Sequence, residues 1–228
     1  MNKLVNIEVI IGTIVIFCSL LIFLFVKKNI TIPNYIKIFY LYPLTVFILS
    51  LITITDMYIY SMPRIFIDVF DNSILIIENI FWGIFFLRYF SNKKSKKYIK
   101  NIFISSLSIV LVLTIINKFN NQNFKIAAIS NLGFTLYCLI FFISLFKNDP
   151  IKKITNDPML WTVTGLFFYS VFSLPLFPLC EYFKNQNNFI LAQVILCVIN
   201  LLIIIMHLFF IKACLCLIRQ HKASLSLY

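Results

Sequence analysis

The chain has 228 residues, of which 61% are hydrophobic and only 12% are charged; its mean hydropathy is +0.95 and its formal net charge is +12. A water-soluble fold of this composition would have too little polar surface to cover itself, which excludes the soluble classes of protein. A strongly basic chain can be a nucleic-acid-binding protein, but here the apolar segments leave no room for a soluble binding domain. We therefore expect a membrane protein whose main partner is the lipid bilayer and which binds no nucleic acid.

Seven apolar segments follow one another along the chain, and a bilayer core needs roughly 17–25 residues of helix to be crossed. The segments cover residues 5–26, 36–54, 65–90, 101–117, 126–146, 159–180 and 189–217. The longest connections between them, 91–100 and 147–158, are too short to hold a catalytic domain. The sequence predicts an all-α membrane protein, a single seven-transmembrane-helix bundle that takes up residues 1–228.

The basic residues predict how this bundle is oriented, because Lys and Arg are retained on the cytoplasmic side of a membrane. Fifteen of the 20 basic residues fall on one side of the predicted bundle: Lys27, Lys28, Lys37, Arg88, Lys93, Lys94, Lys96, Lys97, Lys100, Lys147, Lys152, Lys153, Lys212, Arg219 and Lys222. The other five are Lys3, Arg64, Lys118, Lys125 and Lys184. We expect the N-terminus out and the C-terminus in, in the inner (cytoplasmic) membrane of a bacterium, with anionic lipid beside the basic side.

The acids are skewed in the opposite direction. Six of the eight lie outside or in the outer half of the predicted bundle: Glu8, Asp56, Asp68, Asp71, Glu78 and Glu181. Two interpretations stay open. Either the outer mouth is an acidic vestibule, or these acids pair locally with Arg64, Lys118 and Lys184.

The third segment carries a polar stripe. At 100° per residue, one arc of about 120° holds Asp68, Asp71, Asn72, Leu75, Glu78, Asn79 and Trp82. The remaining surface holds Ile67, Phe70, Ile74, Ile77 and Phe81. At a rise of about 1.5 Å per residue, Glu78 lies about 15 Å deeper than Asp68, close to the midplane. A carboxylate at that depth costs several kcal/mol unless it is paired, hydrated or protonated, so this stripe is the first candidate for a site.

Other segments offer partners for the stripe at comparable depth, namely Thr45, Ser50, Thr53, Thr55, Ser130, Asn131, Thr135, Gln193, Asn200 and His207. The candidate ligand-binding residues are Asp68, Asp71, Asn72, Glu78, Asn79, Asn131, Trp161, Tyr169, Gln193 and Asn200. The same residues could instead be interhelical hydrogen-bond contacts with no ligand. His207 is interpreted as a packing residue, because no second histidine lies near it to form a metal site. With no familiar catalytic motif, we assign no catalytic residue, no metal and no cofactor.

Several residues are interpreted as structural. One glycine in each of four segments, Gly12, Gly83, Gly133 and Gly165, is expected to let helices approach closely. Asp157 and Pro158 predict the capped start of a helix. Pro43, Pro175 and Pro178 can kink their helices. Tyr40, Tyr42, Trp161, Tyr169 and Tyr182 are expected to form an aromatic belt near the segment ends.

Two resemblances bear on function. The topology is similar to that of 3+1+3 transporters of the sugar-transporting SWEET class, but the Pro-Gln pair of that class is missing from the first and fifth segments. The stretches NSILIIENIFW (72–82) and DPMLWTVTGLFFY (157–169), with the pair Ile199-Asn200, resemble seven-helix membrane proteins of Bacteroidetes-type bacteria. That resemblance implies the topology and marks Glu78, Trp161, Gly165, Tyr169 and Asn200 as characteristic positions. It implies no activity.

Three functions follow from these observations. The first is a receptor-like or accessory protein that passes a signal to a separate partner protein. The second is a small transporter with a polar site at the midplane. The third, an intramembrane lipid hydrolase, is disfavoured because the segments hold one histidine. The sequence therefore favours a non-enzymatic protein over an enzyme.

Overall fold

The computed structural model describes the backbone of residues 2–29, 41–58, 64–116, 124–148 and 155–225. It describes the side chains of residues 10–26, 42–48, 51–52, 69, 72–116, 124–147 and 155–220. These ranges contain helices and no strand, which confirms the all-α class. The helices are α1 (Asn2–Asn29), α3 (Leu41–Tyr58), α4 (Arg64–Tyr89), α5 (Lys93–Ile116), α6 (Phe124–Asn148), α7 (Pro158–Asn185) and α8 (Phe189–Leu225).

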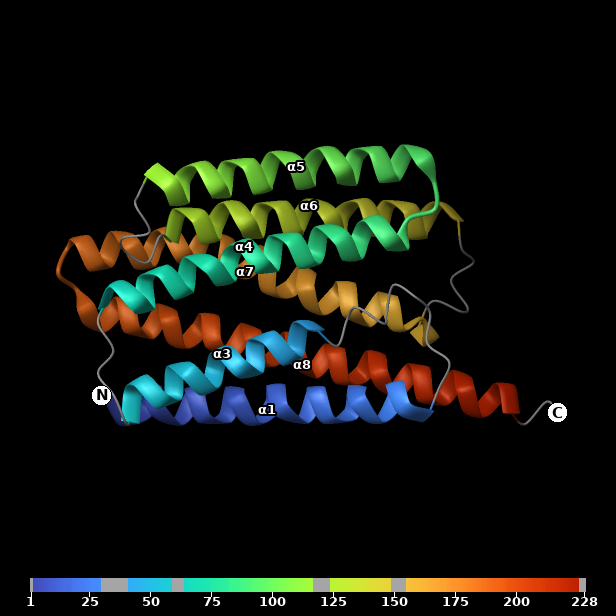
Figure 1. Cartoon of the computed structure of the whole chain (residues 1–228), viewed down its shortest axis with the longest axis horizontal. Coiled ribbons are helices and arrows are strands. Elements are labelled where there is room, and N and C mark those ends of the chain that lie inside the picture. Colours follow the sequence, from blue (N-terminus) through green and yellow to red (C-terminus); the bar gives the residue numbers. More distant parts are fainter. Residues whose placement is uncertain (1, 30–40, 59–63, 117–123, 149–154, 226–228) are drawn as a thin grey trace.

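The described helices form an elongated bundle in which successive elements run in opposite directions (Figure 1). α5 and α1 lie at opposite edges of the view, with α4, α6, α7, α3 and α8 between them. Four of the described helices, α5 to α8, are long and apolar enough to cross a membrane, and α1 holds a shorter apolar stretch over Ile10–Val26. The chain is therefore a multi-pass helical membrane protein.

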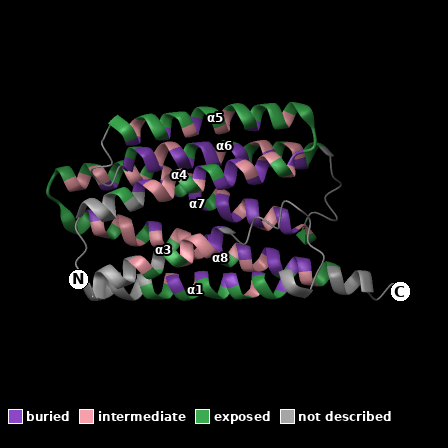
Figure 2. Ribbon diagram, viewed as in Figure 1, coloured by how far each residue is buried: buried purple, intermediate pink, exposed green. Residues whose placement is uncertain are grey.

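The burial pattern fits such an environment. α5 is exposed along most of its length (Figure 2). Its first turns expose lysines, and from Ile104 onward its exposed side chains are largely apolar, among them Ile104, Ile109, Val112 and Ile115. A long apolar face of this kind would be unfavourable in water and is favourable against lipid. Every described helix contributes to one continuous core, which extends from Tyr42 and Trp82 to Met159, Phe210 and Leu217.

One helix boundary differs from the prediction. α5 begins at Lys93, whereas we expected residues 91–100 to connect two helices. Lysine is a good helix former, and its long side chain can reach water from a helix end, so the lysine run continues the helix instead of interrupting it. The connection from α4 to α5 is therefore very short, and the Asn92 side chain accepts a hydrogen bond from the Lys94 backbone N–H at 3.0 Å.

Local sequence signals mark both ends of α7, and the second of them also precedes the start of α8. Asp157 caps α7 by accepting the Met159 backbone N–H at 2.8 Å, with proline in the first turn, which confirms the predicted start. At the other end, Asn187 adopts a left-handed backbone with φ 56°, which asparagine tolerates better than most residues. This turn reverses the chain, and α8 then packs along α7 in the most extensive helix contact of the described structure.

Three glycines permit close approaches between helices, as predicted. A Cβ at Gly165 would lie 2.7 Å from the Phe209 Cβ and 3.1 Å from the Met206 carbonyl oxygen on α8. Gly83 lies directly under the Phe103 ring, and a Cβ at Gly133 would lie 3.2 Å from the Ser106 Cβ. The nearest atom to a Cβ at Gly12 is at 3.8 Å, an ordinary contact.

Candidate functional site

The central polar contact joins α3 to α4. The Tyr42 hydroxyl donates a hydrogen bond to the Glu78 carboxylate at 3.1 Å. We expected Tyr42 to belong to an aromatic belt at the membrane surface, and this was wrong: the side chain is only 4% exposed. Among the described side chains, Glu78 has no cationic partner. The ion pair found in this part of the chain joins Lys125 to Glu181. A half-buried carboxylate with a phenol as its partner still needs a proton, water or a ligand to compensate its charge.

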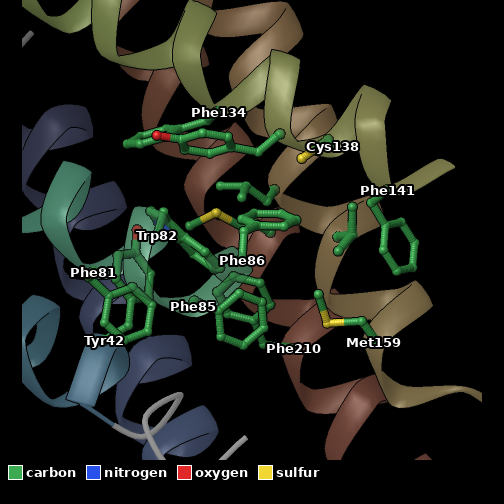
Figure 3. Close-up of a cluster of buried hydrophobic side chains, with 14 of the residues drawn as sticks. Tyr42, Phe81, Trp82, Phe85, Phe86, Phe134, Cys138, Phe141, Met159 and Phe210 are labelled. Carbon is green, nitrogen blue, oxygen red and sulfur yellow. The ribbon is translucent and has the colours of Figure 1, made fainter. Parts of the chain in front are cut away.

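Aromatic rings enclose the Tyr42 side of this contact (Figure 3). The Tyr42 ring lies 5.3 Å from Phe81, 5.0 Å from Trp82 and 6.1 Å from Phe210, measured between ring centroids. These contacts hold the ring while its hydroxyl reaches the edge of the core. The Tyr42 hydroxyl is thus positioned by packing and not by the Glu78 carboxylate alone.

A second polar contact ties α8 to α1 behind Tyr42. The Tyr42 ring stacks on the fully buried His207 ring at 6.1 Å with an interplanar angle of 13°. The Ser19 hydroxyl donates to the Ile16 carbonyl oxygen at 2.7 Å. Because its one proton is used there, the Ser19 oxygen acts as the acceptor for His207 Nδ1, which lies 3.2 Å away. His207 Nε2 has no hydrogen-bond partner among the described residues. His207 therefore packs as expected, with a specific partner on α1 that the sequence did not indicate.

The neighbouring residue Asn79 faces a different helix. Its Nδ2 donates to the Ser130 hydroxyl of α6 at 2.7 Å and to the Leu75 carbonyl oxygen of its own helix at 3.0 Å. Its Oδ1 is buried without a partner among the described residues. Adjacent residues of α4 thus make contacts of two kinds: Asn79 is an amide bonded to α6, and Glu78 is a carboxylate bonded to α3.

Tyr169 of α7 lies near Glu78 and Asn131. It is buried, it lies close enough to Glu78 for an electrostatic interaction, and its hydroxyl faces the Asn131 side chain. Asn131 donates to the Ala127 carbonyl oxygen at 2.8 Å, and its Oδ1 is buried without a partner among the described residues. We call Tyr42, Glu78, Asn79, Asn131 and Tyr169 the polar centre. Its unpaired atoms, two amide oxygens, are hydrogen-bond acceptors.

Where the side chains of α4 are described, the polar stripe faces the inside of the bundle, as predicted. Asn72, Asn79 and Trp82 are buried, and Ile77 is 45% exposed. Phe81 lies in apolar packing against Tyr42. Asp68 and Asp71 fall outside the residues whose side chains are described, so their predicted roles are untested.

The remaining candidates have contacts of their own. Trp161, at the start of α7, donates its Nε1 to the Thr155 carbonyl oxygen at 2.8 Å and stacks on Phe209. Lys212 lies over the Trp161 ring at 5.5 Å. Asn200, on α8, is half-buried. Gln193 lies near the start of α8, and its Oε1 is buried without a partner in the described part of the chain.

Two expectations concern charges and metals. Glu181 pairs with Lys125 at 3.4 Å, a partner outside the set that we expected, which supports local pairing for this one acid. Among the described residues, no group of three or more His, Cys, Asp or Glu side chains could hold a metal ion. The polar centre offers a carboxylate, two amides and two phenols for hydrogen bonding and charge compensation.

Comparison with protein-family models, with curated proteins and with solved structures gave no match to this chain. The resemblance to seven-helix proteins of Bacteroidetes-type bacteria stays a prediction.

Proposed function

We propose that this chain is a seven-span bacterial inner-membrane protein, N-terminus out and C-terminus in, that acts as a receptor-like or accessory sensor. A ligand reaching the polar centre from the outer side would change the Tyr42–Glu78 contact. A separate partner protein would read the change at the cytoplasmic side, since the α4–α5 connection is too short to hold a signalling domain.

The observation that carries this proposal is the position of Glu78. Its carboxylate bonds to Tyr42, and the Tyr42 ring belongs to a core that touches every described helix and continues to Leu217 near the far end of α8. Because packed cores rearrange between discrete states instead of deforming continuously, a change at Glu78 can be passed along this core.

The acceptor-rich composition of the polar centre indicates the kind of ligand. Glu78 offers carboxylate oxygens, and Asn79 and Asn131 each offer an unpaired amide oxygen. A ligand that brings hydrogen-bond donors or positive charge would satisfy these atoms, whereas an anion would leave them unsatisfied.

The proposed orientation draws support from the described charges. Successive helices alternate in direction, which brings nine described basic residues to one end of the bundle: Arg88, Lys93, Lys94, Lys96, Lys97, Lys100, Lys147, Lys212 and Arg219. Lys125 and Lys184 lie toward the other end. A reporter that requires the cytoplasm should be active after Tyr228, and one that requires export should be active at Asn121. The reverse pattern would overturn the orientation and the side from which the ligand comes.

A small transporter is the second candidate, and one observation favours it. α7 carries Pro175 and Pro178 inside the helix, on the same element as Tyr169 of the polar centre. Prolines remove backbone hydrogen bonds and allow a helix to bend, as a gate requires. The lipid hydrolase remains the weakest candidate, because His207 packs against Tyr42 and Ser19.

One experiment separates the two main candidates. The chain has two tryptophans, so Trp161→Phe leaves Trp82, a ring neighbour of Tyr42, as the single fluorescent reporter. Cationic and donor-rich small molecules are screened for a change in Trp82 emission, and each hit is tested for uptake into proteoliposomes. The sensor proposal predicts an emission change that Glu78→Gln abolishes, without uptake. Uptake of the same compound would establish the transporter instead.

A further inference from the structure

A cavity of about 270 Å³ lies where α4 passes into α5, at the basic end of the bundle. It is lined by Tyr89, Phe90, Ser91 and Asn92 from the α4–α5 connection and by Phe141, Ser144 and Leu145 from α6. The lining has a polar part, formed by two serine hydroxyls and an asparagine amide, and a mainly apolar part, formed by three aromatic residues and a leucine. A cavity of this kind suits a molecule with a polar and an apolar part.

The apolar wall is held by ring contacts. Tyr89 packs edge-to-face on Phe90 with ring centroids 5.2 Å apart, and Tyr89 lies 5.5 Å from Phe141 of α6. The wall therefore joins α4 to α6 and is part of the folded core.

Basic residues flank the polar lining residues in the sequence. Arg88 precedes the lining residues, Lys93, Lys94 and Lys96 follow them, and all four are exposed. No acidic residue occurs from Asn79 to Asn148, so the charge is not neutralised by this stretch of chain. Because α5 begins at Lys93, its positive dipole end adds to the same field.

We propose that this cavity binds the phosphate group of an anionic phospholipid. Ser91, Asn92 and Ser144 would donate hydrogen bonds to the phosphate, and the lysines at the start of α5 would compensate its charge. The aromatic wall would contact the glycerol and the first carbons of the acyl chains. This amphipathic lining favours a lipid over a free phosphate compound, and the site does not depend on Glu78.

Native mass spectrometry tests the site. Protein is reconstituted into vesicles of phosphatidylglycerol and phosphatidylcholine in equal parts, extracted into detergent, and the retained lipid is identified. The unmodified protein should retain phosphatidylglycerol. The triple substitution Lys93→Gln, Lys94→Gln and Lys96→Gln should lower retention roughly tenfold or more, and Lys125→Gln at the opposite end should leave it unchanged.

A cavity-filling variant separates a site from general surface attraction. Ser144→Phe keeps every charge and occupies the cavity, so it should lower retention as the lysine variant does. Ser108→Phe, on an exposed position of α5, is its matched control and should have no effect. If Ser144→Phe does not fold, Ser91→Trp fills the cavity from the other wall. Normal retention in a folded cavity-filled variant would overturn the site.

The source of the phosphate is tested in a separate arm with glycerol phosphate added to delipidated protein. We expect no binding at concentrations at which phosphatidylglycerol is retained. Lysine-dependent binding of glycerol phosphate, with no retention of phosphatidylglycerol, would overturn the lipid as ligand.

Discussion

The α7–α8 contact and the α3–α4 contact show two ways in which helices of this protein meet. Along α7 and α8 the backbones approach closely, and Gly165 leaves no room for a side chain next to Met206 and Phe209. Between α3 and α4 the described backbones approach much less, and the long Tyr42 side chain spans the distance to Glu78. Close backbone packing fixes relative position tightly, whereas one hydrogen bond between side chains can be exchanged. The first contact therefore defines the fold, and the second is suited to change.

The largest effect on stability is expected where the helices are closest. Gly165→Ala forces α7 away from the α8 backbone and should lower the free energy of unfolding by about 1–3 kcal/mol. Gly12→Ala is the matched control, because its Cβ would have an ordinary contact at 3.8 Å. Unfolding in mixed micelles measures both. Equal effects would show that the α7–α8 contact is not closely packed.

A smaller effect is expected for the amide that joins α4 to α6. Asn79→Ala removes the 2.7 Å hydrogen bond to Ser130 and should cost about 1 kcal/mol, in the range measured for hydrogen bonds between membrane helices. A double-mutant cycle with Ser130→Ala isolates the pair. Strict additivity of the two substitutions would contradict the bond. Because the proposed ligand also uses the unpaired Asn79 Oδ1, Asn79→Ala should weaken the ligand-induced change in Trp82 emission.

Removing one hydroxyl at the α3–α4 contact should change stability less still. Tyr42→Phe keeps the ring against Phe81 and Trp82 and should alter the free energy of unfolding by less than about 1 kcal/mol. It should nevertheless abolish the ligand-induced change in Trp82 emission. The exposed Tyr182 provides the control substitution Tyr182→Phe. A normal ligand response in Tyr42→Phe would show that the Tyr42–Glu78 bond has no part in signalling.

The sequence predicted the helices and the buried side of α4 because both depend on local periodicity. Apolar runs of sufficient length indicate helices, and a 100° period assigns Asn79 and Ile77 to different sides. The start of α7 was also predictable, since Asp157 and Pro158 act within one turn.

The partners of these residues could not be predicted in the same way. Tyr42 near the start of a segment has the position of a belt residue, and nothing local indicates that its ring packs on α4 and α8. The Ser19–His207 contact likewise joins residues 188 positions apart. Such contacts depend on how the helices are rotated and placed against each other, which the period of a single helix does not determine.

The most direct test of the account compares folded yield with ligand response for Glu78→Gln and Glu181→Gln. Glutamine keeps the shape of Glu78 and can still accept from Tyr42, so the folded yield should stay close to that of the unmodified protein. The loss of charge should abolish the change in Trp82 emission, while Glu181→Gln, at the Lys125 pair, should respond normally. An unchanged response in Glu78→Gln would contradict the central claim and leave Glu78 as an interhelical contact alone.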